Sequence, residues 1–474
     1  MKCLFCASEA FPFMSSGGLA DVAYSLPCAL RSKAIDCRIV MPLYEGIPEE
    51  FKSKMKLSTY FYVPVSWRSQ YCGLFEINYK GIIYYFIDNE YYFKRPEIYG
   101  HFDDAERFAF FSRAILEMLP KIDFKPDIIH ANDWQTALVP VYQRLIYSHY
   151  EYYSKMKTVF TIHNIHYQGK FDKSVIKDIV GVEEKDSFIV HYDGCTNFMK
   201  GAVETADQII TVSPTYAKEI LNSWFSYGLH HVLQKSEWKI VGILNGIDTS
   251  IYNPETDIDI YENYSVEDLP GKTINKKELR LRLNLDDGGE IPLIGMVTRL
   301  VEDKGLELVK EVLDKVMKTE NIQFVVLGSG LKEYEHFFDY MQGKYKGRFS
   351  FCHGFVPELS HKIYAASDIF LMPSKFEPCG ISQMIALKYG SIPIVRETGG
   401  LFDTIKDSGD QKGNGFTFKT YDSLDMMNAI KRAVAGYWQH KGWEILVKRA
   451  MMCDNSWKNS ANKYIDIYKN LVDK

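Results

Sequence analysis

Arg299 and Lys304 stand five residues apart, directly after the apolar stretch 291–297. An Arg offers a planar fork of donors, a Lys offers a compact charge, and the N–H groups that begin a helix add positive potential. The segment therefore predicts a grip on phosphate groups. The alternative is an ordinary solvated turn, in which Glu302 and Asp303 neutralise the two cations.

Two further segments follow apolar runs in the same half of the chain. Glu377 comes after residues 369–373, and its carboxylate can accept hydrogen bonds from sugar hydroxyls, although a loop Glu can also cap a helix. Gly399 and Gly400 come after residues 392–395, and glycines allow backbone N–H groups to approach an oxyanion closely. Together the three segments predict a site for a phosphorylated sugar.

The first half of the chain has polar segments in similar positions. Residues 15–18, Ser-Ser-Gly-Gly, follow the first apolar run, where a glycine pair can accommodate a diphosphate or a hexose. This segment is neither a dinucleotide fingerprint nor a Walker P-loop. Residues 130–134 and 161–166 each end a later run. We expect His163 to reach the site, whereas His166 is interpreted as structural.

Apolar runs alternate with amphipathic stretches along both halves, which predicts parallel sheets covered by helices on both faces. The expected strands are residues 2–7, 36–41, 82–87, 127–130, 158–162, 208–212, 291–297, 322–327, 349–352, 369–373 and 392–395. The clearest expected helices are residues 19–30, 104–119, 275–285, 304–317, 358–366 and 382–388. Ligands of such α/β sheets bind at the carboxyl ends of the strands, where the polar segments above are found.

Composition limits the class of protein. A chain of 474 residues with 46% hydrophobic content is enough for two or three domains with large cores. The 56 Lys and Arg residues against 61 Asp and Glu residues give a net charge of -5, which offers no field for collecting nucleic acid. The nine scattered cysteines lack zinc-site spacing, and no apolar run has membrane length, so we expect a cytoplasmic protein that binds no membrane.

The segments above closely resemble those of bacterial glycogen synthases and plant starch synthases, which are retaining glucosyltransferases of the GT-B fold that extend α-1,4-glucans, usually from ADP-glucose. The resemblance spans nearly the whole chain. Its motifs are residues 7–12, 17–22, 130–134, 211–216, 244–248, 298–300, 376–380, 398–401 and 448–452.

The resemblance implies an α/β protein with two Rossmann-like, doubly wound domains that face each other across a cleft. The acceptor-side domain would span residues 1–241, with a C-terminal helix at 457–474 crossing back to it, and the nucleotide-sugar domain would span residues 242–456. The implied catalytic residues are Glu377, His163, Arg299 and Lys304. The implied substrate-binding residues are Ser15, Gly17, Gly18, Asp21, Asp133, Trp134, Asn245, Phe355, Cys379, Gly380, Thr398, Gly399, Gly400 and Leu401.

The resemblance also implies a reaction. In a front-face displacement, the leaving diphosphate, neutralised by Arg299 and Lys304, would help to deprotonate the incoming 4-hydroxyl. The expected partners are a nucleotide-glucose donor, with ADP-glucose favoured, and an α-1,4-glucan acceptor, with no metal or cofactor. A plastid-type compartment replaces the cytoplasm if the enzyme is plant-like.

One position departs from the family pattern. Family members carry Lys-x-Gly-Gly-Leu in the first loop, whereas this chain has Ser15 there and no other cation until Arg31. A lost charge-assisted hydrogen bond is worth roughly 1.5–3 kcal/mol, which predicts donor handling weaker by on the order of ten- to a hundred-fold. The alternative functions are a glucan-binding or regulatory paralogue and a GT-B transferase for another acceptor.

Overall fold

The computed structural model describes residues 1–354 and 356–473. Within them the chain forms two compact units, the first made of residues 1–243 and 457–473 and the second of residues 244–456. Each unit has its own sheet and its own buried core. In this part of the chain, no helix combines the length and the apolar character that crossing a bilayer requires.

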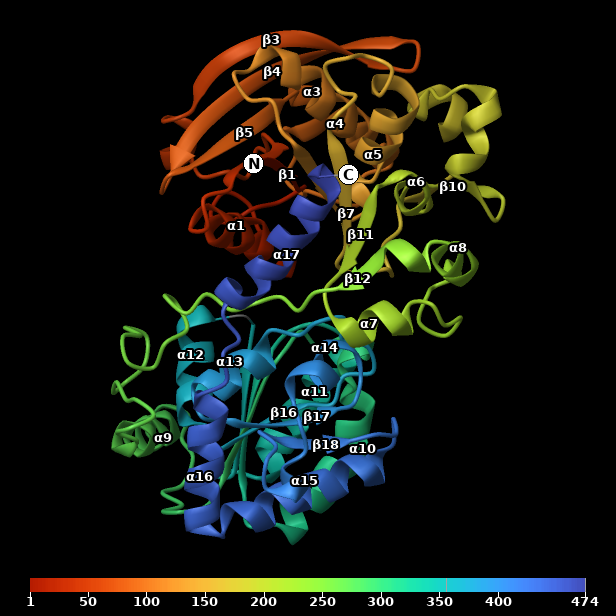
Figure 1. The fold of residues 1–474 in the computed structure, drawn as a ribbon. Helices are drawn as coiled ribbons and strands as arrows, with labels where there is room; N and C mark the ends of the chain where they lie inside the picture. The colour runs from red at the N-terminus through yellow and green to blue at the C-terminus, as the bar shows by residue number, and fades with distance from the viewer. Residues whose placement is uncertain (355, 474) are drawn as a thin grey trace. The chain divides into compact units, whose positions relative to one another are not determined.

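The first unit is built around a sheet with the strand order β12-β11-β7-β6-β1-β2-β5-β4-β3 (Figure 1). Its strands are β1 (Lys2–Cys6), β2 (Asp36–Pro42), β3 (Lys56–Val65), β4 (Arg68–Tyr79), β5 (Ile82–Asp88), β6 (Ile128–Asn132), β7 (Lys157–Ile162), β11 (Gln208–Thr211) and β12 (Ile240–Gly242). The pairing is parallel from β12 through to β5. In β1, Leu4 and Phe5 point to opposite faces and both are fully buried, which explains why this strand is a continuous apolar run.

Helices and a small antiparallel sheet complete the first unit. The small sheet has the order β8-β10-β9 and consists of β8 (Lys170–Phe171), β9 (His191–Tyr192) and β10 (Cys195–Asn197). The helices are α1 (Gly18–Arg31), α2 (Glu49–Lys52), α3 (Glu90–Phe93), α4 (Asp104–Met118), α5 (Leu138–Tyr142), α6 (Phe198–Thr205), α7 (Pro214–Glu219), α8 (His230–Lys235) and α17 (Trp457–Val472). Helix α17 packs on α1 (Figure 1). The hydroxyl of Tyr468 in α17 lies 2.6 Å from Nδ1 of the buried His130.

Strands β3 and β4 depart from the all-parallel expectation. They pair antiparallel with each other, and β4 pairs antiparallel with β5. The sequence does carry a signal for β3, because the exposed Tyr60 and Tyr62 alternate with the buried Phe61 and Val63. This period of two is typical of a strand with one solvent-facing side. The hairpin therefore needs no helix on its outer face.

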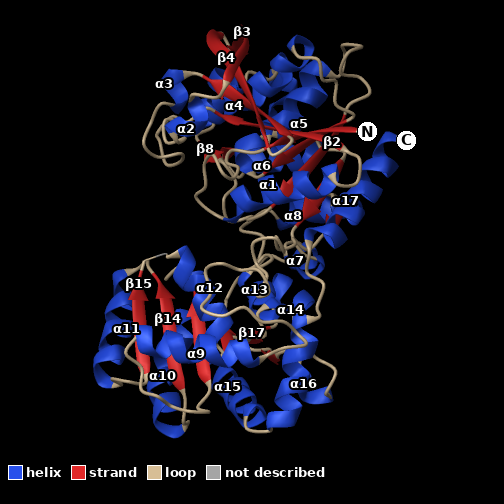
Figure 2. Cartoon of the chain, turned by 90° about the vertical axis from the view of Figure 1, so that its left-hand side faces the viewer, coloured by secondary structure: helices blue, strands red, loops and turns tan. Residues whose placement is uncertain are grey.

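The second unit has a parallel sheet with the order β15-β14-β13-β16-β17-β18. Its strands are β13 (Leu293–Val297), β14 (Gln323–Gly328), β15 (Phe349–His353), β16 (Ile369–Met372), β17 (Ile392–Arg396) and β18 (Phe416–Phe418). Its helices are α9 (Pro270–Arg282), α10 (Leu306–Thr319), α11 (Lys332–Lys344), α12 (Pro357–Ala366), α13 (Ser382–Lys388), α14 (Gly399–Thr404), α15 (Ser423–Tyr437) and α16 (His440–Met451) (Figure 2). The chain winds outward from β13 to β15 and then returns to β16, so the topological switch point lies between β13 and β16.

Two predicted helices begin more than one residue away from their start in the structure. Helix α9 begins at Pro270 rather than at residue 275, because proline is well suited to the first turn of a helix. Lys304 does not begin α10. It ends a separate 3₁₀ turn, η7 (Glu302–Lys304), and Gly305 follows with φ +70° before α10 starts at Leu306.

Candidate active site

The three predicted segments of the second unit follow neighbouring strands. Arg299 and Lys304 follow β13, Glu377 follows β16, and Gly399 follows β17. Because β13, β16 and β17 lie side by side and parallel, their carboxyl ends share one edge of the sheet. That edge is at the topological switch point, where α/β sheets bind ligands.

A direct ion pair joins the first two segments. Nζ of Lys304 lies 2.6 Å from Oε2 of Glu377, and the Ser374 hydroxyl donates to the same oxygen at 3.0 Å. The Glu377 side chain is 9% exposed and that of Lys304 is 20% exposed. Oε1 of Glu377 accepts no hydrogen bond from the described residues, so it remains available as an acceptor at the strand ends. Ser374, three residues before Glu377, was not predicted for the site from the sequence.

The backbone around this pair explains its geometry. The carbonyl of Asp303 accepts hydrogen bonds from the N–H groups of Lys375 at 2.9 Å and Phe376 at 3.3 Å, which ties turn η7 to the loop after β16. A Cβ atom at Gly305 would lie 2.0 Å from the Pro373 carbonyl oxygen. Only glycine fits here, because the position needs both a positive φ and this close approach. The turn and the loop therefore hold Lys304 and Glu377 together.

Arg299 is placed differently from Lys304. It is exposed, and its guanidinium makes no hydrogen bond or ion pair with any other described residue. The solvated-turn alternative required Glu302 and Asp303 to neutralise the cations, but neither carboxylate forms an ion pair with Arg299 or Lys304 within the described residues. The strand ends thus present one cation paired with a carboxylate and a second cation with its five N–H donors unused.

The glycine pair after β17 packs closely against the 377–379 loop. The Gly400 N–H already donates to the carbonyls of Glu377 at 3.2 Å and Pro378 at 3.1 Å, so it is not free for an oxyanion. A Cβ atom at Gly399 or Gly400 would lie 2.0 Å from a carbonyl oxygen of the 377–379 loop. The pair is glycine because this loop passes directly over the start of α14. Thr398 and Leu401, on either side, are buried at the same edge.

Asn245 lies next to the same loop. Its backbone N–H faces the thiol of Cys379, and burial raises the pKa of that thiol to about 12, so the cysteine acts as a neutral packing residue. Oδ1 of Asn245 is buried without a hydrogen-bond partner among the described residues. Gly380 turns the chain with φ +71°. An unsatisfied buried acceptor at this edge is consistent with a ligand that supplies the donor.

The first unit brings Asp133 and His163 together at the ends of β6 and β7. A carboxylate oxygen of Asp133 accepts the His163 N–H at 2.8 Å and the Asn164 N–H at 3.4 Å. Burial raises the pKa of Asp133 to about 7. Asp133 has φ +54° and ψ -178°, a backbone conformation that is costly for any residue except glycine. Such strain is found most often at functional sites.

The tautomer of His163 follows from its neighbour Asn132. The Asn132 amide nitrogen donates to the carbonyls of Cys6 and His130, so its oxygen must accept from Nε2 of His163, 2.9 Å away. Burial lowers the pKa of His163 to about 3, so the ring is neutral and its Nδ1 is an acceptor. His163 is therefore suited to receive a hydroxyl hydrogen bond rather than to donate a proton. Asn132 was also not predicted for the site from the sequence, although it lies within the motif 130–134.

The remaining predicted residues of the first unit lie near the ends of β1 and β6. Gly17 and Gly18 begin α1, and a Cβ atom on either would meet no described atom within 4 Å. Ser15 and Asp21 are exposed on either side of them. Trp134 is half-buried, with its ring against Phe108 and Phe171 at centroid distances of 4.9 and 5.8 Å. Phe355, also predicted for the site, lies outside the described residues.

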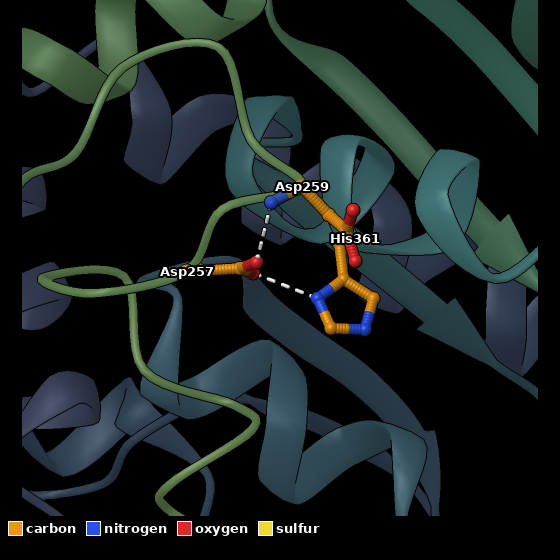
Figure 3. Close-up of side chains that lie close together, drawn as sticks. All are labelled: Asp257, Asp259 and His361. Atoms are coloured by element: carbon orange, nitrogen blue, oxygen red, sulfur yellow. Dashed lines mark hydrogen bonds and ion pairs between the residues drawn. The ribbon is translucent and has the colours of Figure 1, made fainter.

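One group of side chains in the described part of the chain has the donor types of a metal site. Figure 3 shows Asp257, Asp259 and His361, whose potential ligand atoms lie within 4.8 Å of one another. Nδ1 of His361 is 2.7 Å from Oδ2 of Asp257, and the Tyr389 hydroxyl donates to that same oxygen. Oδ2 of Asp257 and Nδ1 of His361 are thus engaged in hydrogen bonds. We interpret the group as a tether that holds the irregular segment before α9 onto α12.

Comparison with known proteins agrees with this architecture. Residues 2–235 match the family described as starch synthase catalytic domain, and residues 278–444 match glycosyl transferases group 1. A glycogen synthase from Geobacillus thermodenitrificans is 49% identical over 478 residues, covering 100% of this chain and 98% of that protein. One from Alkaliphilus metalliredigens is 49% identical over 475 residues, covering 99% and 100%.

Two solved structures are similar to this one. The catalytic domain of starch synthase IV from Arabidopsis thaliana, bound to ADP and acarbose, is 34% identical with a TM-score of 0.91, covering 100% of this chain and 99% of that one. A sucrose-phosphate synthase from Thermosynechococcus elongatus, 16% identical with a TM-score of 0.62 over 99% of this chain and 98% of that one, shares the fold.

Two Rossmann-like units with charged and polar groups at their strand ends define a GT-B glycosyltransferase. The chain belongs to the family of starch and glycogen synthases. The predicted family, fold class and glucosyltransferase activity are thereby confirmed. The paralogue alternative finds no support, because the relatives are themselves named glycogen synthase.

Proposed function

We propose that this enzyme transfers glucose from ADP-glucose to the 4-hydroxyl at the end of an α-1,4-glucan, with retention of the anomeric configuration. The observation that carries the proposal is the pair formed by Lys304 and Glu377 beside the unpaired Arg299. This arrangement offers fixed positive charge for a diphosphate and a carboxylate oxygen for hydroxyl groups. The starch synthase with the similar structure was solved with ADP and acarbose, which supports both ligand classes.

The second unit would hold the donor. Arg299 can bind the diphosphate with two parallel N–H donors, and Lys304 adds a second positive charge. Oε1 of Glu377 would accept a glucose hydroxyl, while Oε2 stays bound to Lys304 and Ser374. Asn245, Cys379, Gly380 and residues 398–401 would line the same pocket. As the bond to the diphosphate breaks, these cations would stabilise the charge that develops on the leaving group.

The first unit would bind sugar hydroxyls. The neutral ring of His163 would accept a hydroxyl at Nδ1, and Asp133 would orient the His163 backbone. The open surface over Gly17 and Gly18 leaves room for a hexose or a phosphate close to the backbone. Ser15, Asp21 and Trp134 would be further substrate contacts of the first unit. Phe355 remains a proposed contact of the base from the family resemblance alone.

A donor competition assay tests the proposal. The purified enzyme is incubated with glycogen and either ADP-glucose or UDP-glucose, each labelled in the glucose, and incorporation into glucan is counted. We expect incorporation from both donors to be measurable and that from ADP-glucose to dominate. Extension from neither donor would refute the synthase assignment. Preference for UDP-glucose would overturn the donor assignment alone.

A further inference from the structure

The first unit contains a cavity of about 640 Å³ at the edge of β3, away from the strand ends described above. Its walls come from the end of β3, helix α4, the helical turn η3 (Gln143–Tyr147) and the segment 181–186. None of the residues assigned to the active site lines it. A volume of this size is within the range of small-molecule pockets.

Two guanidinium groups, those of Arg113 and Arg144, line the cavity. Arg113 is held in place, because its Nε donates to the Tyr147 hydroxyl at 2.6 Å and its guanidinium lies over the Tyr142 and Tyr147 rings at 5.2 and 4.9 Å. Its Nε also lies 3.8 Å from Oε1 of Glu117, and its terminal nitrogens donate to no described residue. Arg144 also lines the cavity, and its guanidinium makes no hydrogen bond or ion pair within the described residues. Two Arg side chains with unused N–H donors favour the binding of a phosphate or a carboxylate group.

The rest of the lining suits a polyhydroxylated molecule. Ser66, Glu183 and Asp186 offer oxygen acceptors on the wall formed by segment 181–186 and the turn after β3. Lys185 is already paired with Glu183 at 2.8 Å, so it does not add to the unused positive charge. Leu145 and Val182 supply apolar surface on which a sugar ring can rest.

This mixture distinguishes between ligand classes. A nucleotide is disfavoured, because the one aromatic ring in the described lining is the small, exposed imidazole of His149, which offers a base little surface to stack on. Inorganic phosphate would fill only a small part of the volume and would leave the Asp186 carboxylate without a donor. A neutral oligosaccharide would leave the Arg144 guanidinium without a counter-charge, whereas Arg113 already has Glu117 as a partner.

Two local features of the walls fit a ligand site. Turn η3 and the turn η4 (Ile176–Val180), which leads into segment 181–186, are both π-helical. Such turns are uncommon and are found frequently at functional sites. Both stand directly beside lining residues, and η3 contains Arg144 itself.

We propose that this cavity binds a phosphorylated monosaccharide, with Arg113 and Arg144 on the phosphate and with Ser66, Glu183 and Asp186 on the hydroxyls. The site is separate from the donor site. It does not depend on the identity of the donor or the acceptor of the transfer reaction.

Calorimetric titration of the full-length enzyme with glucose 1-phosphate tests this proposal, with ADP present at saturation to occupy the donor site. We expect saturable binding that Arg144→Ala weakens by about ten- to a hundred-fold, the loss expected for a charge-assisted hydrogen bond. Arg144 is exposed, so this variant should fold normally. Lys177→Ala is the matched control, since it removes a nearby exposed cation that does not line the cavity.

Several results would contradict all or part of this proposal. Absence of saturable binding to the ADP-saturated enzyme, or equal affinities of Arg144→Ala and the wild type, would overturn the site. Inorganic phosphate and glucose are titrated as separate ligands. If inorganic phosphate binds as tightly as glucose 1-phosphate, the sugar part of the assignment is wrong. If glucose binds as tightly, the phosphate part is wrong.

Discussion

The two units carry polar groups at equivalent places in their sheets, yet the groups differ in charge. In the second unit, Lys304 and Glu377 form an ion pair beside the unpaired Arg299. In the first unit, burial raises the pKa of Asp133 to about 7 and lowers that of His163 to about 3, which favours the neutral form of both. The comparison shows why phosphate chemistry is assigned to one unit and hydroxyl recognition to the other.

The glycine pairs of the two units also differ, in how closely other backbone atoms approach them. Gly399 and Gly400 are enclosed by the carbonyls of the 377–379 loop, whereas Gly17 and Gly18 face open space. From the sequence the two pairs look alike, since each follows a strand and begins a helix. One pair allows backbone packing, and the other leaves room for a ligand.

The largest expected effect is on Glu377. Glu377→Ala should lower kcat by roughly 10²–10³-fold, because it removes a fixed acceptor and leaves Lys304 without its partner. The control is Glu302→Ala, an exposed carboxylate in the turn that carries Lys304. Both are measured by glucan extension from ADP-glucose, with circular dichroism to check folding. Near-normal turnover of Glu377→Ala would remove this residue from the catalytic set.

The cations should come next. Arg299→Ala and Lys304→Ala should each reduce kcat/KM for the donor by about ten- to a hundred-fold, the loss of a charge-assisted hydrogen bond to phosphate. Titration with ADP should show weaker binding in both variants. Lys310→Ala, which removes a cation on α10, serves as the control. Unchanged ADP affinity in Arg299→Ala would mean that its free guanidinium does not contact the diphosphate.

The glycine pairs can be compared directly. Gly400→Ala should cost roughly 1–3 kcal/mol of folding free energy, because its Cβ atom would lie 2.0 Å from the Cys379 carbonyl oxygen. Gly18→Ala, the matched change in the first unit, should leave stability nearly unchanged, since its Cβ atom meets no described atom within 4 Å. Urea unfolding measures both. Equal losses of unfolding free energy in the two variants would show that the two glycine pairs are packed alike.

A pH series separates the protonation state of Asp133 from its contacts. The folded pKa, about 7, lies above the ordinary value of 3.8, so the folded protein binds more protons than the unfolded chain between these values. The Asp133 contribution to stability is present below about pH 4 and is lost as pH rises to about 7. Asp133→Asn keeps an acceptor oxygen and cannot ionise. Its stability relative to the wild type should rise by on the order of 1–3 kcal/mol across this window.

Urea unfolding of the wild type and Asp133→Asn at several pH values between 4 and 8 checks this expectation. His163 contributes in the opposite direction between about pH 3 and 6.5, because its folded pKa is lowered. It contributes equally to both proteins and therefore cancels in the difference. A difference that is independent of pH would show that Asp133 is ionised in the folded enzyme.

The smallest expected effect concerns Ser15. Ser15→Lys restores the cation of the family pattern. It should raise kcat/KM for ADP-glucose by less than about ten-fold, which is below the ten- to a hundred-fold expected from the sequence alone, because Ser15 is exposed and an exposed cation gains little from a flexible contact. Ser16→Lys is the control, because it places the same charge one residue away. A similar gain in both would indicate a general effect of charge. No gain in either would mean that Arg299 and Lys304 neutralise the donor without help from this loop.

Much of the architecture could be predicted from the sequence. The strands of the second unit are continuous apolar runs, and this pattern places β13, β14, β16 and β17 to within one or two residues. The antiparallel β3 and β4 were missed, because a half-exposed hairpin lacks such a run. The residue types at the strand ends indicated phosphate and sugar chemistry, because Arg and Lys donate to phosphate oxygens and a Glu carboxylate accepts from sugar hydroxyls.

The sequence by itself determined which side chains could hold a phosphorylated sugar, since that property belongs to the chemical groups. Only the tertiary structure decided how they are used. The strand order places β13 beside β16, so that Lys304 reaches Glu377 across 73 residues of sequence. Burial sets the protonation of Asp133 and His163, and the path of the 377–379 loop gives Gly400 its role. These properties depend on distances and solvent exclusion, which arise only when distant segments pack together.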